Sequence, residues 1–220
     1  ERYAYSNFGY NLLGRVIERL TDQSYEDYVR RHVLKPIGVT TMKIGGTRLA
    51  DRSPNEVRYY QPGTGKSVFQ QDLEQTVPWP YGAWYLEAMD SHGGWIASAT
   101  DLAKFAAAFD DVDHSPILSK DSIRRMYQRP AGLPETDEDG KPKETWYSLG
   151  WMNRRVGEDR TNYWHTGSLS GTATILIRRH DGVNLVALMN TRVSPSASHL
   201  GRAIDSLLHK AANEVDLKKL

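Results

Sequence analysis

The sequence predicts an α+β fold, in which an antiparallel sheet with flanking helices is joined to a helical, loop-rich part. Segments with helical periodicity, separated by long irregular runs, occupy the first 145 residues, whereas strand-like segments gather after residue 146 and one more helix closes the chain. Helices followed by strands, instead of strict alternation, are typical of this class. We therefore divide one 220-residue domain into a helical and loop-rich subdomain (residues 1–145) and a part that holds the sheet strands and C-terminal helix (residues 146–220).

The first two helices are predicted from apolar residues that recur every three or four positions. Residues 8–21 show this pattern, and Ser6 or Asn7 supplies a good N-cap. Ser24 opens the second helix. We expect this helix to end at Lys35-Pro36, because the residue before a proline is disfavoured in the helical conformation.

The stretch from residue 38 to residue 90 is mostly irregular, with one short strand candidate at residues 56–60. An irregular run of this length inside a compact domain is often functional or ligand-lining. Its aromatic side chains either wall a cleft or pack the loops together, and the sequence leaves both alternatives open. These aromatic residues are Tyr59, Tyr60, Trp79, Tyr81, Trp84 and Tyr85.

Helical periodicity returns at residues 101–109, after Thr100 as the expected cap, and at residues 120–128. A polar surface loop spans residues 132–145. Short links then connect several strands into an expected antiparallel meander, which a helix over residues 196–212 follows. The strand candidates are Tyr147–Arg155, Thr161–His165, Thr172–Arg178 and Val183–Met189.

Composition excludes several classes of function. The 28 basic and 27 acidic residues are scattered and give a net charge of +1, so we expect no nucleic-acid partner, because phosphate binding needs a clustered positive excess. The absence of cysteine excludes disulfides, thiolate zinc sites and a cysteine nucleophile. No apolar run approaches the ~20 residues of a transmembrane helix. With no His-Glu-x-x-His motif and no phosphate loop, we expect neither a metal nor another cofactor.

Two short elements remain as candidates for catalysis. Tyr5-Ser6-Asn7 lies at a helix start, and His165-Thr166-Gly167-Ser168 lies at a strand end. Histidine changes its charge near neutral pH, and glycine lets a backbone edge approach a ligand closely. Each residue alone is also compatible with a structural role, such as an N-cap or a strand-end histidine.

Together these elements resemble the second and third motifs of the serine β-lactamase and penicillin-binding-protein superfamily, especially its branch of class C β-lactamases, DD-peptidases and esterases. The resemblance extends over nearly the whole chain. Further matching segments are Leu34-Lys35-Pro36-Ile37-Gly38, Gly93-Gly94 through Asp101-Leu102, Tyr147-Ser148-Leu149-Gly150-Trp151, and Asp181-Gly182 through Met189-Asn190. The resemblance implies a β-lactamase/transpeptidase-like fold and a serine hydrolase that acts on an amide or ester through an acyl-enzyme.

The resemblance also implies residue roles. Tyr5, Asn7 and His165 are the expected catalytic residues, with Tyr5 in proton transfer, Asn7 holding the substrate amide or ester, and His165 as a cation beside Tyr5. Substrate-binding roles fall on Thr166, Gly167 and Ser168, whose backbone N–H forms half of an oxyanion hole. The implied substrate is a small molecule or peptide, namely a β-lactam, a D-Ala-D-Ala peptide or a simple ester.

One expected motif is absent. No serine in the 220 residues has a lysine three positions later, so Ser-x-x-Lys, which supplies the nucleophile in this superfamily, is not present. We expect an inactive fragment, with the N-terminal strands and the nucleophile's helix encoded upstream. The alternative is a non-catalytic penicillin- or peptide-binding module of the same fold.

Two further expectations concern self-association and the cellular compartment. Without the early strands, a sheet edge should be uncovered, and we expect self-association through it. The sequence does not fix the compartment, although the resemblance implies a periplasmic or secreted protein.

Overall fold

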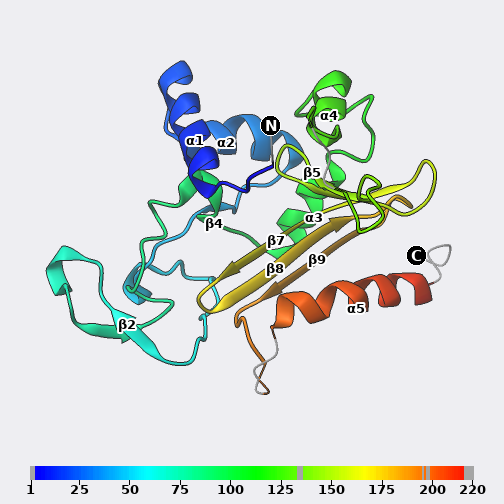
Figure 1. The fold of residues 1–220 in the computed structure, drawn as a ribbon. Helices are drawn as coiled ribbons and strands as arrows, with labels where there is room; N and C mark the ends of the chain where they lie inside the picture. The colour runs from blue at the N-terminus through cyan, green and yellow to red at the C-terminus, as the bar shows by residue number, and fades with distance from the viewer. Residues whose placement is uncertain (1–2, 133–135, 195, 197–198, 216–220) are drawn as a thin grey trace.

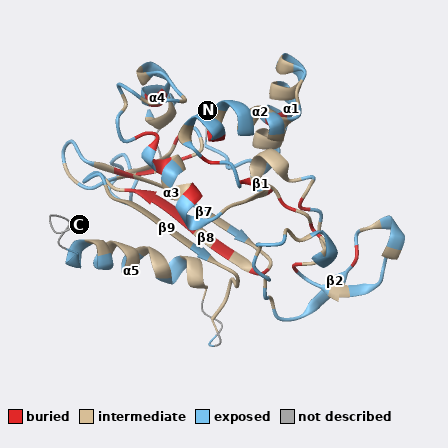
Figure 2. Ribbon diagram, turned by 180° about the vertical axis from the view of Figure 1, so that it is seen from behind, coloured by how far each residue is buried: buried red, intermediate tan, exposed pale blue. Residues whose placement is uncertain are grey.

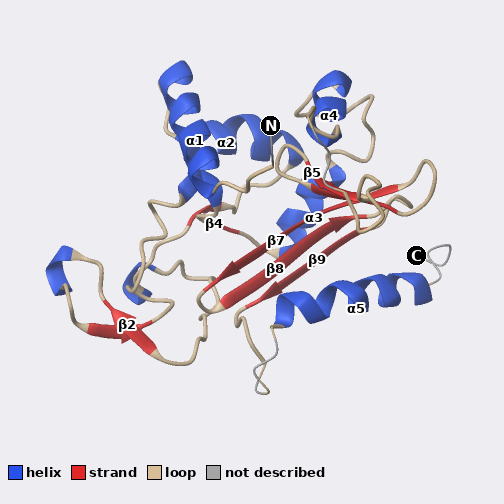
Figure 3. Cartoon of the chain, viewed as in Figure 1, coloured by secondary structure: helices blue, strands red, loops and turns tan. Residues whose placement is uncertain are grey.

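A computed structural model describes residues 3–132, 136–194, 196 and 199–215. At its centre lies a five-stranded antiparallel meander in the order β5-β6-β7-β8-β9 (Figure 1). Helix α5 (Leu200–Glu214) runs along one face of this sheet, and helix α3 (Ala99–Ala107) packs on the other (Figure 3). The predicted α+β fold, an antiparallel sheet with flanking helices, is therefore confirmed. The strands are β5 Thr145–Tyr147, β6 Met152–Arg155, β7 Thr161–Leu169, β8 Thr172–Arg178 and β9 Asn184–Met189.

The main core lies between the sheet and helices α3 and α4 (Lys120–Tyr127). Strand β8, which lies between β7 and β9, is buried along most of its length, which Figure 2 shows in red. Successive strand residues point to opposite faces, so Leu176 faces α3 while its neighbours Ile175 and Ile177 face α5. Burying one such side chain stabilises the fold by about 1.5–3 kcal/mol. The buried residues of this core are Ala106, Phe109, Ile123, Trp151 and Leu176.

A second, smaller core lies beside the second helix of the chain. Helix α1 (Asn7–Thr21) packs beside α2 (Tyr25–Val29), and β1 (Lys43–Ile44) pairs with β4 (Trp95–Ile96) below them. Leu34, Val39 and Met42 are its buried residues, and Trp95 and Leu102 pack against them. Helix α1 contacts α2 and the 3₁₀ turn Asp90–His92, and it lies above the sheet in the view of Figure 1.

Serine side chains cap the N-termini of α1, α2, α3 and α4. Ser6 caps α1 and its Oγ accepts a hydrogen bond from Gly9 N at 2.9 Å, and Ser24 Oγ accepts one from Asp27 N at 3.1 Å. Helix α3 begins two residues earlier than expected. Ser98, not Thr100, accepts from Asp101 N at 3.1 Å and also donates to the Asp101 carboxylate, so it satisfies two groups at once.

Three predicted boundaries were wrong. The second helix does not stop at Pro36 but continues through a π turn (Arg30–Leu34) and a 3₁₀ turn (Lys35–Ile37), because proline is tolerated in the first turn of a helix. The segment predicted as one strand, Tyr147–Arg155, is two strands that a tight turn connects, with Gly150 at a φ of 83°. Residues 56–60 form no strand, since only an isolated bridge joins Tyr60 to Thr191.

Other boundaries differ less. Helix α4 agrees with the prediction to within one residue. Among the described residues, helix α5 begins at Leu200. Residues 197 and 198, which belong to the predicted start of this helix, lie outside the described residues. The same applies to residues 133–135 of the predicted polar loop.

The irregular middle region contains a small hairpin, β2 (Thr64–Lys66) with β3 (Thr76–Pro78), that extends away from the main sheet (Figure 1). Single 3₁₀ turns at Leu49–Asp51, Gln70–Asp72 and Asp90–His92 interrupt the rest. The division at residue 145 stays a prediction. Helices α3 and α4, which precede it, pack directly on the sheet.

Within the described ranges, no helix is long and apolar enough to span a membrane.

Candidate active site

The free edge of β7 is the first feature of the candidate site. Strand β6 pairs with β7 only from Thr161 to Trp164, whereas β8 pairs with it as far as Leu169. Between His165 and Leu169, the edge of β7 away from β8 therefore has no strand partner among the described residues. Backbone N–H and C=O groups on such an edge can pair with an extended ligand.

The predicted substrate-binding residues lie on this edge. Thr166, Gly167 and Ser168 continue strand β7, so the expectation that the strand ends at His165 was wrong. Pairing with β8 keeps them extended, and Gly167 lies opposite Thr174. A Cβ at Gly167 would come within 2.4 Å of Thr174 Oγ1, so the close pairing of the two strands requires a glycine there.

Aromatic side chains gather where the N-terminal segment meets the end of β5. The Tyr5 ring packs edge-on against Tyr147 with 5.7 Å between centroids, and the Tyr3 ring lies 5.6 Å from Tyr147. Tyr147 in turn contacts His165, with 5.9 Å between ring centroids. The Tyr10 phenol also lies close enough to Tyr147 to raise the pKa of the Tyr147 hydroxyl. We call Tyr3, Tyr5, Tyr10, Tyr147 and His165 the tyrosine–histidine cluster.

The two main predicted residues, Tyr5 and His165, thus lie in one cluster although 160 positions separate them in the sequence, and Tyr147 lies between them. Sequence reasoning named Tyr147 only as part of a matching segment and gave it no role. The signal was present in the pattern, since Tyr147 is a tyrosine at a strand end next to the turn glycine Gly150. The catalytic role of these residues stays a prediction.

Burial controls protonation in this cluster. Desolvation lowers the pKa of the His165 imidazole below its ordinary value, and a hydrogen bond with the Thr166 backbone opposes that shift. Desolvation also raises the pKa of the Tyr147 phenol, and the neighbouring phenols of Tyr10, Tyr5 and Tyr3 raise it further. At neutral pH the structure therefore favours a neutral imidazole beside a protonated phenol, whereas the sequence led us to expect a cationic His165.

Helix α1 positions the remaining predicted residue, Asn7, whose side chain is exposed at the first turn. The helix is fixed at its middle by the buried Gly14, which lies directly against Ser91. Ser91 Oγ donates to the Tyr10 carbonyl at 3.0 Å, and Asn11 Nδ2 donates to the Ala88 carbonyl at 2.9 Å. These contacts hold the N-terminus of α1 next to the tyrosine–histidine cluster.

One contact near the free edge was missed. Ser168 Oγ lies 3.3 Å from His199 Nε2, at the start of α5. No sequence pattern pointed to this pair, because the contact depends on how α5 docks on the sheet.

The irregular middle region closes one end of the free edge. Gly171, in the β7–β8 turn, approaches so closely that an added Cβ would lie 2.8 Å from Pro80 and 2.9 Å from Tyr59. Tyr59 N donates to the Tyr81 hydroxyl at 2.7 Å, and the two rings pack at 6.4 Å. These aromatics therefore pack the loops together while they also bound the end of β7.

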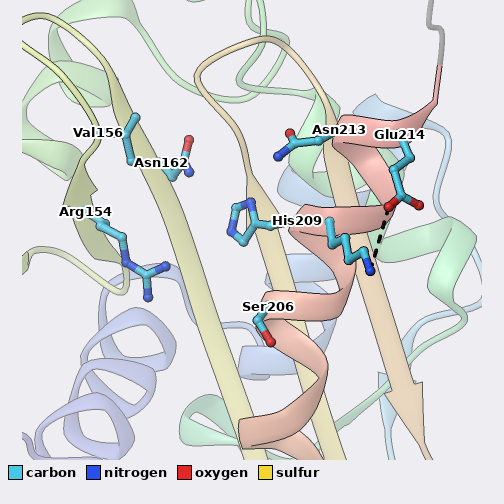
Figure 4. Close-up of a pocket in the computed structure, with 8 residues that line it drawn as sticks. Arg154, Val156, Asn162, Ser206, His209, Asn213 and Glu214 are labelled. Atoms are coloured by element: carbon cyan, nitrogen blue, oxygen red, sulfur yellow. Dashed lines mark ion pairs between the residues drawn. The ribbon is translucent and has the colours of Figure 1, made fainter.

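A separate cleft lies on the opposite face, between β6, β7 and α5 (Figure 4). Its cations are compensated by carboxylates: Arg154 pairs with Asp205 at 3.4 Å and Lys210 with Glu214 at 3.9 Å. Since these charges cancel, the cleft has no net attraction for an anion. Among the described residues, no group of three or more His, Asp or Glu side chains is arranged to hold a metal ion.

The chain is similar to proteins of one known family. The Beta-lactamase family model matches residues 1–209. Penicillin-binding protein 4* of Bacillus subtilis is 27% identical over 187 residues, which cover 82% of this chain and 38% of that protein. The chain thus spans well under half the length of this relative.

Solved structures share the fold. D-amino acid amidase from Ochrobactrum anthropi SV3, complexed with D-phenylalanine, superposes with a TM-score of 0.66 at 22% identity and covers 98% of this chain and 60% of its own. A class C β-lactamase gives a TM-score of 0.65 at 15% identity, over 97% of this chain and 57% of its own. At these identities the similarity establishes the fold alone.

Proposed function

The chain belongs to the β-lactamase family, and from this membership we propose that it carries one wall of the active site of a serine hydrolase that cleaves an amide or ester through an acyl-enzyme. The resemblance read from the sequence is confirmed at the level of the family. The substrate class, the acyl-enzyme and the residue roles are the proposal.

One observation carries it: Tyr5 and His165, distant in the sequence, gather around Tyr147 beside the free edge of β7. A structural role for each residue does not require them to meet. Acyl transfer does require it, because a proton-transfer group, a substrate-binding edge and an oxyanion-binding N–H must face one reacting carbonyl.

In the proposed mechanism, the substrate lies along the free edge of β7, with its backbone or amide group against Thr166 and Gly167. The Ser168 N–H donates to the oxygen of the tetrahedral intermediate. Tyr5 exchanges the proton of the attacking serine hydroxyl and of the leaving group. Asn7, exposed at the start of α1, hydrogen-bonds to the substrate amide or ester.

The nucleophile has no candidate in the printed sequence, which contains no Ser-x-x-Lys. We propose that the serine and its lysine belong to a segment of the native polypeptide outside these 220 residues, a proposal that the 38% coverage of penicillin-binding protein 4* supports. Substrate candidates are a β-lactam, a D-Ala-D-Ala peptide, an amino acid amide or a simple ester. D-amino acid amidase is among the structural neighbours.

The test uses the native polypeptide with its preceding sequence. Incubation with a fluorescent penicillin and with a fluorophosphonate should label one serine of a Ser-x-x-Lys motif, which peptide mass spectrometry locates. Tyr5→Phe should slow the labelling by about 10²-fold or more, the usual effect of losing a proton-transfer group. Tyr28→Phe is the matched control, because Tyr28 stacks on His32 at 4.6 Å and lies outside the cluster.

Other outcomes would contradict parts of the proposal. Covalent labelling of the 220-residue chain itself would show that its nucleophile is present. Equal rates for Tyr5→Phe and the parent would remove Tyr5 from catalysis. Saturable binding of penicillin without any covalent product, together with an upstream sequence that lacks Ser-x-x-Lys, would establish the non-catalytic binding module instead.

A further inference from the structure

Tyr147 makes the closest polar contact to His165 in the tyrosine–histidine cluster. Its hydroxyl lies 3.0 Å from Nε2 of the imidazole, well within hydrogen-bond range. Both residues are partly buried, and Tyr147 lies at the end of β5, where the tight turn to β6 begins. The proposed mechanism gives Tyr147 no role so far.

The donor count limits how this contact is made. A phenol has one proton and can also accept, whereas a neutral imidazole has one donor nitrogen and one acceptor nitrogen. If the Tyr147 hydroxyl donates to Nε2, the ring proton lies on Nδ1. If Nε2 carries the proton, Nδ1 becomes the acceptor. The direction of one hydrogen bond therefore selects the tautomer of His165.

We propose that Tyr147 is a positioning residue for His165: its hydroxyl donates to Nε2, which fixes the ring as the neutral Nδ1–H tautomer and directs the Nδ1 proton to the Thr166 backbone. The consequence for catalysis rests on the proposed function, but the hydrogen-bond direction does not.

The electrostatics agree with this direction. The hydrogen bond between the His165 ring and the Thr166 backbone raises the imidazole pKa, as a backbone carbonyl that accepts the ring proton does, although burial outweighs it and the net pKa is lowered. Burial raises the pKa of Tyr147, so its phenol keeps the proton that it donates. The titratable groups around this contact are the phenols of Tyr3, Tyr5 and Tyr10.

The role of the bond follows from where Thr166 lies. Thr166 is the second residue of the free edge of β7, so a ring anchored at both nitrogens ties the backbone of the proposed substrate edge to β5. Without the Tyr147 hydroxyl, the imidazole is free to exchange tautomers and to turn about its side-chain bonds. The geometry of the edge next to Tyr5 would then be less fixed.

The tautomer is measurable in the 220-residue chain without substrate or activity. Long-range ¹H–¹⁵N correlation spectra of a ¹⁵N-labelled sample distinguish a protonated from an unprotonated ring nitrogen, and His165→Gln assigns the signals. We expect Nδ1 to be protonated and Nε2 to be unprotonated at pH ~7.5. Tyr147→Phe removes only the hydroxyl and should shift the tautomer ratio by about fivefold or more, the ratio that one hydrogen bond sets.

Tyr163→Phe is the matched control. Tyr163 lies on β7 two residues before His165, and its ring stacks on Tyr127 at 3.9 Å, so losing its hydroxyl should leave the His165 signals unchanged. Far-UV circular dichroism checks that each variant is folded.

Two results would overturn the proposal. An Nε2–H tautomer in the parent chain reverses the hydrogen bond and needs no variant to be interpreted. An unchanged tautomer ratio in folded Tyr147→Phe shows that the hydroxyl does not set it. Neither result affects the labelling test of the proposed function, so failure of one proposal is distinguishable from failure of the other.

Discussion

The substitution Gly14→Ala tests how α1 is held at the candidate site. A Cβ at position 14 would lie 2.4 Å from Ser91 Oγ and 2.7 Å from Ser91 Cβ. Favourable carbon contacts lie at about 3.5–4.0 Å, so α1 and Ser91 must separate by roughly 1 Å. Such overpacking costs about 1–3 kcal/mol, and the separation weakens the Ser91–Tyr10 hydrogen bond, worth about 1 kcal/mol.

An opposing effect has to be subtracted. At an exposed helix position, replacing glycine by alanine stabilises by about 1 kcal/mol. The balance predicts that Gly14→Ala destabilises the chain by about 1–3 kcal/mol in urea unfolding followed by circular dichroism. Because Tyr5 and Asn7 lie at the N-terminus of this helix, the displacement should also disturb the Tyr5–Tyr147 contact.

The compensating exchange separates crowding from a general effect on the helix. Ser91→Gly removes both atoms that the new methyl group meets, so in the double variant Gly14→Ala with Ser91→Gly the loss should be clearly smaller than the sum of the two single losses. If Gly14→Ala is as stable as the parent, or if the two losses simply add, the close approach of α1 to Ser91 does not hold the helix.

Other parts of the structure give further expectations. Because burial lowers the pKa of His165, its stabilising contribution is complete above the unfolded-state value of about 6.5 and is lost as the pH falls through the folded-state pKa. His165→Gln should therefore lessen the fall in urea stability between pH ~7.5 and ~5, and parallel pH profiles would refute this. Arg178→Met removes the buried donor to the Tyr127 hydroxyl (2.6 Å) and Asp110 (2.9 Å) and should cost about 3 kcal/mol; a loss below about 1 kcal/mol in urea unfolding would contradict it. The α1 residues Phe8, Leu12, Val16 and Leu20 are exposed, and β9 pairs only with β8 among the described strands, so sedimentation velocity should detect self-association or thermal melting should occur at low temperature. A monodisperse monomer with a high melting temperature would refute this last expectation.

Local signals explain which elements were predicted well. Helix α1 has an apolar stripe and a serine cap, and β8 and β9 flank an Asp181-Gly182 turn. The sequence features that predict each of these elements therefore lie within or next to the element itself. The failures depend on tertiary contacts. The extension of β7 beyond His165 requires pairing with β8, and the turn that splits residues 147–155 is set by Gly150 in a positive-φ conformation.

In the candidate site too, local motifs could be found in the sequence, whereas tertiary contacts could not. Motif order along the chain was enough to select Tyr5, Asn7 and the residues from His165 to Ser168. It did not identify Tyr147 as the residue between Tyr5 and His165, nor His199 as the neighbour of Ser168, because contacts across 18 and 31 positions depend on how strands and helix pack. Motif order also could not give the charge of His165, because burial lowers the pKa of its imidazole and favours the neutral ring.

That change of charge alters what the rest of the site must supply. A tyrosine acts as a base near neutral pH only when nearby positive charge favours its phenolate. With His165 held neutral, the positive charge next to Tyr5 has to come from another group, and among the residues of the family's motifs the lysine of Ser-x-x-Lys is the remaining one. If the proposed function holds, a lowered His165 pKa therefore makes catalysis more dependent on the proposed segment outside these 220 residues, because a neutral imidazole supplies no positive charge.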